Sequence, residues 1–536
     1  MSAPRTYYVT TPIYYVNDRP HVGHAYTTTI ADVMARFHRL QGDDVFFLTG
    51  TDEHAAKVVD SAAAHGVTPQ AWADRNAAAF EAAFARLGIR CSDFIRTTQS
   101  RHKERVLRYV EQLLASGDVY PGVYEGWYDA GQEEYVTDTK AQECDYKSPI
   151  NGKPLVRKSE TNYFFALSRY AEPLLALLDS HPDFVSPEAR RNEIRSRILG
   201  GLNDVPMSRT GSVDWGIKMP GDETQTIYVW IDALFNYMTC VDTDERRRYW
   251  PPVLQLLAKD IVWFHAVIWP ALIMALQKVP GNEWMRLPHK IYAHSFWISE
   301  GQKMSKSLGN FIDLEKIESY CERFGVDAFR WFLATQGPLE AVDSDFSEAR
   351  FIDVYNSELA NGVGNCASRV TNMVGRYFEG RLPAPGAHEG DGEPLARLAA
   401  RAVDAYRAAM AQVDLSGAFG AALSLVRAVD GYIEKTQPFK MAKDPSNLPR
   451  VGAVLYDCAE AIRIASLLLW PAMPQRMAEL WNRLGFGEET AALAGDVAGA
   501  SGRLDAWANW GWLKEGAPVS KGDALFARHA PPADRA

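Results

Sequence analysis

Residues 6–50 read "TYYVTTPIYYVNDRPHVGHAYTTTIADVMARFHRLQGDDVFFLTG", and this succession predicts a strand, a helix and a second strand. The first ten residues are rich in β-branched and aromatic side chains, and the turn-forming run "VNDRP" ends them. Apolar side chains then recur at helical spacing, at Ile30, Val33, Met34 and Phe37. The compact apolar run "DVFFLTG" is typical of a buried parallel strand. Together these patterns predict a β-α-β unit.

The same alternation returns after a long interruption. "TIYVWIDALF" (226–235) predicts a strand leading into a helix, "IVWFHAVIWPALIMAL" (261–276) a buried helix, and "KIYAHSFWIS" (290–299) a further strand. Between about residues 120 and 221 the chain is rich in turn-forming residues, as expected of an insertion. After about residue 350 it is alanine-rich and predicted to be almost entirely helical.

This order predicts a Rossmann-like, doubly wound α/β domain that is split by an inserted domain and followed by an all-α bundle. We expect four segments along the chain. They are 1–117 with 222–288 (α/β domain), 118–221 (insertion), 289–350 (a linking segment with a lysine-rich loop) and 351–536 (helical domain and C-terminal tail).

Composition limits the classes of function. The 536 residues are 47% hydrophobic and carry a net charge of −10, which argues against a non-specific DNA coat but allows local RNA-binding patches. The six cysteines stand far apart in the sequence, so we expect a reducing, cytoplasmic compartment. Neither a secretion signal nor an apolar run of about 20 residues is visible, and no membrane association is expected.

The stretch "NDRPHVGHAYT" (17–27) lies where the first helix should begin. His21 and His24 are three apart and would share the first helical turn, while Gly23 would let a nucleotide approach the backbone. A helix N-terminus favours anions, so two imidazoles there suit phosphates. Taken alone, a pair of polar capping residues is the more frequent explanation of such a motif. The helix itself has two candidate N-caps, Asn17 and Asp18.

The stretch "GQKMSKSLGN" (301–310) places two lysines three apart, among hydroxyls and between glycines. Lys303 and Lys306 could form a cationic clamp for a polyphosphate, and Gly301 and Gly309 would let the loop close over it. A short run of this kind is more often solvated surface. Its position after the last predicted strand brings it toward the first helix, because ligands of a doubly wound sheet bind at the carboxyl ends of the strands.

The two motifs occur together and in the order found in class I aminoacyl-tRNA synthetases, which the chain therefore resembles. "TPIYYVN", "LTGTDEH", "YVWIDALFNY" and "KDIVWFHAVIWP" are similar to segments of the methionyl-tRNA synthetase family, and the resemblance runs from about Tyr7 to about Gly485. It implies a ligase that activates L-methionine with ATP, Mg²⁺ accompanying the ATP, and transfers it to the 3′-terminal adenosine of methionine tRNA.

The resemblance also implies roles for individual residues. His21, Gly23, His24, Lys303 and Lys306 match the ATP-binding and catalytic motifs, and Asp260 matches the residue that binds the ribose. Asp52 matches the carboxylate that receives the α-ammonium. The remaining methionine-pocket residues would be Ile13, Tyr15, Trp230, Ala233, Leu234, Tyr237, Ile261, His265 and Trp269. Aromatic walls suit a polarizable thioether. The family usually has glycine at the position of Ala258, where a methyl group would crowd the ribose.

The insertion departs from the family pattern, in which many members carry a zinc knuckle. Asp129 and Gln132 stand at the first pair of ligand positions, and Ser148 and Asn151 at the second. Cys144 is the only thiol nearby, and one thiolate with scattered oxygens is a poor tetrahedral zinc site. We therefore expect an insertion without zinc.

In the helical region, "NGVGNCASRV" and "EKTQPFK" resemble the family's anticodon-reading helices. Asn365 and Arg369 match two anticodon contacts, and Pro438 and Phe439 stand where the family usually has Pro-Trp. Phenylalanine can stack on a base but lacks the indole donor, and it can also belong to the core of a bundle. The sequence ends without the further domain that dimeric members carry, so a monomer is expected.

Two other classes of function remain open at this point. A nucleotidyltransferase that makes a dinucleotide cofactor would share the H-x-G-H motif, but it would not need a methionine pocket or a long helical region. A non-catalytic tRNA-binding relative would keep the helical region and lose the motifs. Methionine-dependent exchange of pyrophosphate into ATP, with and without tRNA, separates all three.

Overall fold

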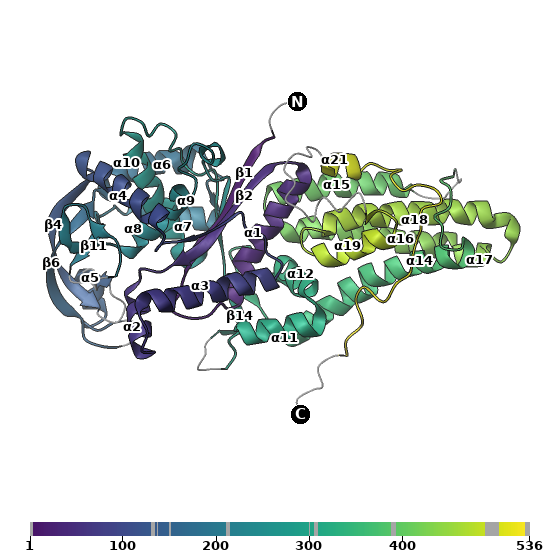
Figure 1. Ribbon diagram of the computed structural model, residues 1–536, viewed down its shortest axis with the longest axis horizontal. Coiled ribbons are helices and arrows are strands. Elements are labelled where there is room, and N and C mark those ends of the chain that lie inside the picture. Colours follow the sequence, from purple (N-terminus) through teal and green to yellow (C-terminus); the bar gives the residue numbers. More distant parts are fainter. Residues whose placement is uncertain are drawn as a thin grey trace.

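The computed structural model describes residues 4–129, 134–136, 138–148, 152–210, 215–299, 301–304, 309–386, 393–487 and 503–530. An α/β region and a long helical region lie side by side along the molecule, joined through α1 (Val22–Gln41) and α12 (Val326–Gln336) (Figure 1). Among the described helices, none is both long and apolar enough to span a membrane.

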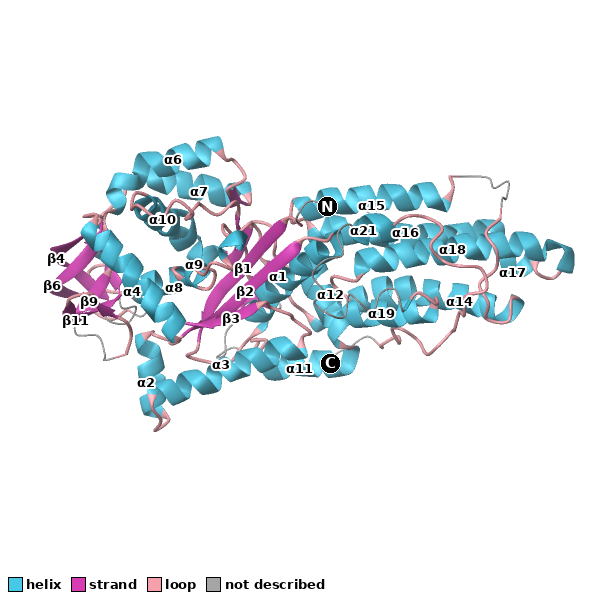
Figure 2. Cartoon of the chain, turned by 45° about the horizontal axis from the view of Figure 1, so that its top comes forward, coloured by secondary structure: helices cyan, strands magenta, loops and turns pink. Residues whose placement is uncertain are grey.

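A six-stranded parallel sheet forms the centre of the α/β region (Figure 2). Its strand order is β3 (Asp93–Arg96), β2 (Asp44–Asp52), β1 (Thr6–Tyr15), β12 (Leu254–Ala258), β13 (Ile291–His294) and β7 (Val185–Ser186). The chain leaves β1 toward β2 on one side and returns to β12 on the other. The order therefore reverses beside β1, which is where doubly wound folds bind their ligands. The predicted fold class is confirmed.

Side chains of the strands alternate between two cores. On β1, Tyr7 and Val9 pack toward α1 and α3 (Pro69–Arg86), whereas Tyr8 packs on the opposite face. The opposite face is covered by helices that include α4 (Ser100–Ala115), α6 (Ala171–Ser180), α7 (Glu188–Leu199), α8 (Val229–Leu234), α9 (Asn236–Thr239) and α10 (Trp269–Gln277). The short α2 (Ala56–Ala64) follows β2 and packs with α3.

The segment 261–276 is buried as predicted, but it is not one regular helix. A 3₁₀ turn (Lys259–Ile261) follows β12, a π-helix (Phe264–Ile268) comes next, and α10 then begins at Trp269. Pro270 at the start of α10 explains part of this break, because proline is accepted only in the first turn of an α-helix. π-helical turns are frequent at functional sites.

The insertion folds into two small antiparallel sheets. One has the order β5 (Glu134–Val136), β4 (Val119–Asp129), β6 (Val156–Phe165) and β8 (Val205–Pro206), with α5 (Asp138–Glu143) beside it. The other has the order β10 (Lys218–Met219), β11 (Asp222–Ile227) and β9 (Ser208–Thr210). The strand predicted in 226–235 thus ends at Ile227 and belongs to the second small sheet rather than to the central one.

The expected segment boundaries differ from this topology at two places. The edge strand β7 comes from within 118–221, and β13 from within 289–350, yet both pair in the central sheet. Three short strands of the sheet, β3, β7 and β12, are absent from the sequence prediction. They have two to five residues each, too few for a clear periodic signal.

The second half of the chain is helical, as predicted. A small sheet contains β14 (Trp297–Ser299), β15 (Gln302–Lys303) and β16 (Ser344–Asp345), and the helices that follow β15 form a bundle whose core is continuous with the α1 face of the central sheet. They are α11 (Leu314–Phe324), α12, α13 (Glu348–Val354), a π-helix (Tyr355–Gly364), α14 (Asn365–Tyr377), α15 (Leu395–Ala411), α16 (Leu415–Thr436), α17 (Pro438–Met441), α18 (Leu448–Leu469), α19 (Pro474–Arg483) and α21 (Arg503–Trp507).

Candidate active site

The turn between β1 and α1 carries the two histidines of the first motif. His21, rather than Asn17 or Asp18, is the N-cap of α1, because its extended backbone lets the imidazole reach the helix amides. The Gly23 N–H donates to His21 Nδ1 at 3.0 Å, and the His21 N–H donates to His24 Nδ1 at 3.2 Å. Each Nδ1 is an acceptor in these bonds, so each neutral ring carries its proton on Nε2.

Gly23 is required by the packing of this turn. A Cβ atom there would lie 2.9 Å from His21 Cε1, so the imidazole would have to shift, and its 3.1 Å distance to Nδ1 would also be tight. The two imidazole rings lie 3.8 Å apart between centroids. Burial and the neighbouring His21 lower the pKa of His24 well below its ordinary value, so this ring stays neutral at neutral pH. Such rings offer N–H donors at a helix N-terminus, where phosphates bind.

The second motif is anchored to the first. Lys303 lies exposed on β15, and Gly301 and Gly309 both adopt positive φ angles, of 72° and 68°. Lys306 lies outside the described residues, as do Ser305 and Ser307. Where the chain emerges from the loop, the Val22 N–H donates to the Ile312 carbonyl at 3.0 Å. An isolated β-bridge joins His21 to Asp313, the residue after Ile312. The Phe311 ring contacts the His21 ring edge-on, with 5.1 Å between the centroids.

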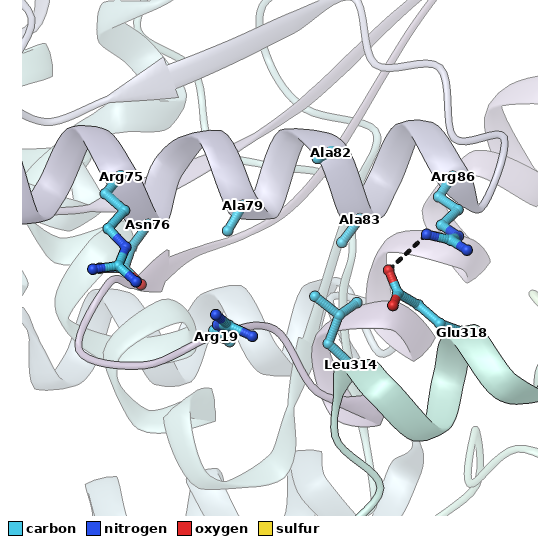
Figure 3. Close-up of a pocket in the computed structure, with 9 residues that line it drawn as sticks. All are labelled: Arg19, Arg75, Asn76, Ala79, Ala82, Ala83, Arg86, Leu314 and Glu318. Atoms are coloured by element: carbon cyan, nitrogen blue, oxygen red, sulfur yellow. Dashed lines mark hydrogen bonds and ion pairs between the residues drawn. The ribbon is translucent and has the colours of Figure 1, made fainter.

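Ion pairs hold the helix that follows the loop. Figure 3 shows the cavity between α3, α11 and Arg19, with Arg86 of α3 pointing to Glu318 of α11. The Arg86 guanidinium lies 2.9 Å from both Glu318 and Glu322, and Arg19 lies 2.9 Å from Glu315. Each of these exposed pairs is worth little alone, about 0–1 kcal/mol. Together they fasten α11 both to α3 and to the histidine turn.

One cavity collects nine of the ten predicted methionine-pocket residues. It measures about 310 Å³, open space at its mouth included, and lies at the carboxyl ends of β1 and β2. Its predicted lining residues are Ile13, Tyr15, Asp52, Trp230, Ala233, Leu234, Tyr237, Ile261 and His265. Trp269 does not line it: this side chain is fully buried behind Tyr237, with 5.9 Å between the ring centroids.

Tyr237 and His265 form a fixed polar pair in the wall. His265 Nδ1 lies 3.0 Å from the Ile261 carbonyl, so Nδ1 must donate and Nε2 must accept. The Tyr237 hydroxyl therefore donates to His265 Nε2, at 2.7 Å. Burial lowers the pKa of His265 to about 4, which keeps the ring neutral. The pair presents a polar edge inside an otherwise apolar and aromatic cavity.

Asp52 brings a carboxylate to the same cavity. Its side chain is buried at 2% exposure, and its Oδ1 atom has no hydrogen-bond partner within the protein. Burial is the main cause that raises the pKa of Asp52 well above its ordinary value, and the nearby Asp232 and Glu53 add to it. Burying an acceptor without a hydrogen-bond partner costs free energy. A cationic ligand that donates a hydrogen bond to Asp52 Oδ1 would remove this cost on binding.

A buried chain of hydrogen bonds lies under this wall, and sequence reasoning missed it. Asp232 accepts from His54 at 2.6 Å and from His102 at 2.7 Å, and His102 also contacts the Thr239 hydroxyl at 2.8 Å. Burial opposes ionisation of Asp232, but the two histidines outweigh it and lower its pKa to about 2. These hydrogen bonds connect the loop after β2 with α4, α8 and α9.

Three further lining or wall residues were not predicted. Pro12 and Asn236 line the cavity, and Phe264 stacks on Trp230 with ring centroids 4.0 Å apart. Phe264 lies on the π-helix, whose irregular spacing hides its orientation from a helical pattern. His54 was visible in "TDEH" and Asn236 in "ALFNY", but no spacing rule joins them to the pocket.

The predicted ribose residue, Asp260, lies exposed in the 3₁₀ turn at the carboxyl end of β12. This is the strand beside β1, at the reversal of strand order. Ala258 has a φ of −84° and a ψ of 154°, which any L-residue adopts. An alanine in place of the usual glycine therefore introduces no backbone strain.

Comparisons with known proteins identify the family. A family model described as "tRNA synthetases class I (M)" matches residues 7–148 and 142–371. The chain belongs to this family. The Methionine--tRNA ligase of Streptomyces coelicolor is 43% identical over 98% of this chain and 97% of its own length. That of Caldanaerobacter subterraneus subsp. tengcongensis is 41% identical over 98% of this chain and 79% of its own length.

Solved structures agree with this assignment. Mycobacterium tuberculosis methionyl-tRNA synthetase in complex with methionyl-adenylate has a TM-score of 0.85, 36% identity, and coverage of 98% of this chain and 100% of that chain. The apo form of the same synthetase has a TM-score of 0.82 and 33% identity, over 99% of this chain and 100% of that chain. The resemblance seen in the sequence motifs is thereby confirmed.

The predicted tRNA-binding residues of this class I synthetase lie at the far end of the helical region. Asn365 is exposed at the start of α14, and Arg369, one turn later, pairs with Asp430 at 2.8 Å and Glu434 at 2.5 Å on α16. On α17, Pro438 is buried and Phe439 is 37% exposed. Phe439 is thus not a core residue of the bundle.

The insertion of this synthetase has a small core where zinc-binding members would have a knuckle. Val136, Ala141 and Leu155 are buried together, with Trp127 packed against them. Asp129 and Ser148 are buried nearby, whereas Gln132 and Asn151 lie outside the described residues. The described residues contain no group of three or more His, Cys, Asp or Glu side chains that could hold a metal ion.

Proposed function

We propose that this synthetase activates L-methionine with ATP to methionyl-adenylate and transfers the methionyl group to the 3′-terminal adenosine of methionine tRNA. One observation carries the proposal: a buried carboxylate with an unpartnered oxygen, Asp52, lies in an aromatic cavity beside a turn that presents two neutral imidazoles. The carboxylate suits an α-ammonium, the cavity a thioether, and the turn a polyphosphate.

Binding of the two substrates follows from these groups. The methionine side chain enters between Trp230 and Tyr237, where aromatic walls suit the polarizable sulfur better than they suit a methylene group. ATP enters with its Mg²⁺ above the histidine turn. His21 and His24 donate from Nε2 to its phosphates, and Asp260 holds the ribose.

Adenylate formation then requires positioning and charge compensation. The methionine carboxylate oxygen attacks the α-phosphorus, and the bond from that phosphorus to the pyrophosphate oxygen breaks. Lys303 and Lys306 offset the charge that develops on the departing pyrophosphate. A ribose hydroxyl of the tRNA then attacks the carbonyl of the mixed anhydride, and AMP leaves. Neither step needs a protein nucleophile.

The helical region supplies tRNA recognition in this proposal. Asn365, Arg369, Pro438 and Phe439 contact the anticodon, and Phe439 stacks on a base. The synthetase acts as a monomer in the cytoplasm, as its separated cysteines, all of them free, and the sequence similarity suggest.

The insertion is proposed to fold without zinc. Its small apolar core supports this, because that core supplies packing that a structural metal would otherwise provide. Metal analysis of the purified protein should find no stoichiometric zinc, and a chelator should inhibit only by removing Mg²⁺. One tightly held zinc per chain would contradict this part of the proposal.

The test is methionine-dependent exchange of labelled pyrophosphate into ATP, measured with and without tRNA. We expect exchange with methionine alone, and methionylation when tRNA is added. A dinucleotide-forming nucleotidyltransferase would exchange pyrophosphate without methionine, and a non-catalytic tRNA-binding protein would not exchange it at all. Either result would overturn the proposed function.

A further inference from the structure

The cavity contains a second buried acceptor that lacks a partner. Asn236 is 1% exposed, lines the same cavity as Asp52, and its Oδ1 atom makes no hydrogen bond within the protein. Most buried polar atoms are paired, and leaving one unpaired costs about 1–3 kcal/mol. Two such acceptors in one cavity indicate a ligand that brings more than one donor.

The orientation of the Asn236 amide is determined by its nitrogen. Nδ2 donates to the Ala233 carbonyl at 2.6 Å, and exchanging nitrogen for oxygen would place two acceptors in contact. A flip of the amide therefore cannot give this oxygen a hydrogen-bond partner. It stays available as an acceptor in the cavity wall.

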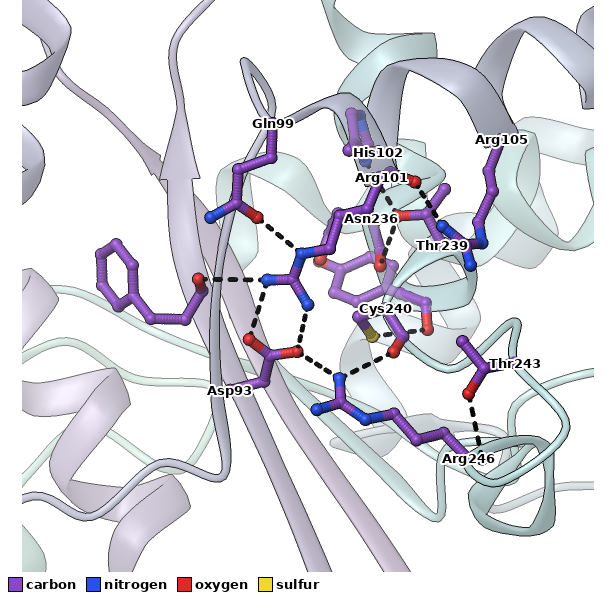
Figure 4. Close-up of polar contacts among 12 residues, drawn as sticks. Asp93, Gln99, Arg101, His102, Arg105, Asn236, Thr239, Cys240, Thr243 and Arg246 are labelled. Atoms are coloured by element: carbon purple, nitrogen blue, oxygen red, sulfur yellow. Dashed lines mark hydrogen bonds and ion pairs between the residues drawn. The ribbon is translucent and has the colours of Figure 1, made fainter.

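The short helix that carries Asn236 is itself held in place. Figure 4 shows Asn236, Thr239 and Cys240 beside a network from α4 and β3. Thr239 contacts His102 at 2.8 Å, and the Arg246 guanidinium donates to Asp93 at 2.6 Å and to the Cys240 carbonyl at 3.2 Å. Anchors on both sides of α9 hold the Asn236 side chain at a fixed place, as a binding group requires.

The chemistry of the substrate selects what these acceptors bind. In methionine the carboxylate and the thioether are acceptors only, and the α-ammonium is the single donor group, with three N–H bonds. We propose that Asn236 Oδ1 is a second ammonium ligand, which accepts one N–H while Asp52 Oδ1 accepts another. This inference rests on the proposed function and adds a substrate-binding residue to it.

A neutral acceptor beside a carboxylate has a specific advantage. Asp52 alone could bind any cation, but two acceptors in different directions fix the rotation of the ammonium about its Cα–N bond. They thereby favour an α-amino acid over an analogue with a hydroxyl group or a hydrogen at that carbon. The loss of Asn236 should consequently weaken the binding of amines and leave the binding of ligands without nitrogen unchanged.

The test compares two inhibitors that differ in the ammonium alone, L-methioninol and 4-(methylthio)butan-1-ol. Asn236→Ala should weaken L-methioninol binding about 10- to 150-fold, the usual loss for a hydrogen bond to a charged group. Binding of the nitrogen-free alcohol should change less than about twofold. Asn236→Ser keeps an acceptor on a shorter side chain, so it should lose less affinity for L-methioninol than Asn236→Ala. Inhibition constants and isothermal titration both give these values.

A matched control is Asn282→Ala. Asn282 is also buried, at 5% exposure, and its Nδ2 also donates to a carbonyl, that of Leu276 at 3.1 Å, but it does not line the cavity. It should leave both inhibitors unaffected, and melting curves of all variants report any general loss of folding.

Equal losses for both inhibitors in Asn236→Ala would make Asn236 a packing residue and overturn the inference. So would unchanged binding of L-methioninol. Failure of the proposed function looks different, because the unsubstituted protein would then not bind L-methioninol or exchange pyrophosphate with methionine at all.

Discussion

The proposed methionine cavity and the proposed anticodon end of the helical region present their polar groups in opposite ways. In the cavity, Asp52 and Asn236 are almost fully buried and each keeps one oxygen without a partner. At the proposed anticodon end, Arg369 is partly exposed and already paired with two carboxylates, and Phe439 is 37% exposed. The cavity is prepared for one small ligand, whereas the helical end must exchange its present contacts for a partner.

The difference fits what each region is proposed to recognise. A small molecule such as methionine offers few contacts, so each must be made in a dry and rigid site. A tRNA is a large polyanion whose phosphates supply much of the affinity, and its bases are bound by stacking at the surface. Substitutions in the cavity should therefore cost far more than substitutions at the helical end.

The largest effect is expected for Asp52→Asn. Removing one partner of a buried ion pair costs about 3–5 kcal/mol, so kcat/KM for methionine should fall roughly 150- to 5,000-fold. Pyrophosphate exchange at varied methionine concentration measures this loss. Affinity for tRNA, measured by filter binding, should stay unchanged, because the substitution lies in the other region. An Asp52→Asn variant with normal methionine kinetics would show that the ammonium binds elsewhere.

Asp52 also predicts the direction of a pH effect. Burial raises its pKa, and only the ionised carboxylate attracts the ammonium, so methionine binding should strengthen as the pH rises through that pKa. The methionine KM of the unsubstituted protein should accordingly fall as the pH rises through that pKa. Asp52→Asn should abolish this dependence, which separates Asp52 from other titrating groups.

The next effect is expected for Lys306→Ala. Loss of a positive charge at the departing pyrophosphate should slow adenylate formation about 10²–10³-fold, as for the removal of one oxyanion-hole donor. Methionine affinity should hardly change, because none of the described residues of the lysine loop lines the cavity. Stopped-flow measurement of adenylate formation, together with titration of L-methioninol, separates the two. Normal adenylate formation would exclude the clamp.

The sequence predicted the two regions unequally well. Nine residues that the motifs assigned to one pocket line a single cavity, because each belongs to a short segment whose place at the carboxyl ends of parallel strands follows from the fold; their roles stay predictions. It placed Trp269 in the cavity wall, although the π-helix before α10 turns this side chain into the core behind Tyr237.

What the sequence missed depends on contacts between distant segments. Asp232 receives hydrogen bonds from His54 and His102, which lie 178 and 130 residues away along the chain. No local pattern marks such partners. The edge strand β7 has only two residues and pairs with β13, which follows it by about a hundred positions. At the helical end, the pairing of Arg369 with α16 was equally invisible.

A smaller effect, confined to tRNA, is expected for Phe439→Ala. Stacking on a base contributes roughly 1–3 kcal/mol, so kcat/KM for tRNA should fall roughly 5- to 150-fold while pyrophosphate exchange stays unchanged. Phe439→Trp should be neutral or slightly better. If Phe439 acted in packing instead, its truncation would lower the melting temperature and reduce both reactions together. Charging kinetics and a melting curve from one preparation decide between the two roles.

The smallest effect is expected for Glu434→Gln. The Glu434 side chain is 64% exposed, so its ion pair with Arg369 should contribute less than about 1 kcal/mol to folding. Its negative charge, however, lies beside a residue that must approach an anionic partner. Neutralising it should leave the guanidinium with Asp430 as its remaining carboxylate partner and strengthen tRNA binding about two- to fivefold at low salt, with less gain at high salt because ions screen exposed charges.

The matched control for this prediction is Glu393→Gln, which removes one negative charge from another arginine pair, that with Arg401. Both variants change the net charge by the same amount, so a general electrostatic gain would appear in both. A gain only in Glu434→Gln would place Arg369 at the tRNA surface and show that the helical end exchanges its contacts on binding. A weaker affinity in Glu434→Gln would mean that the carboxylate holds Arg369 in its binding orientation, and the helical end would then be as preformed as the cavity.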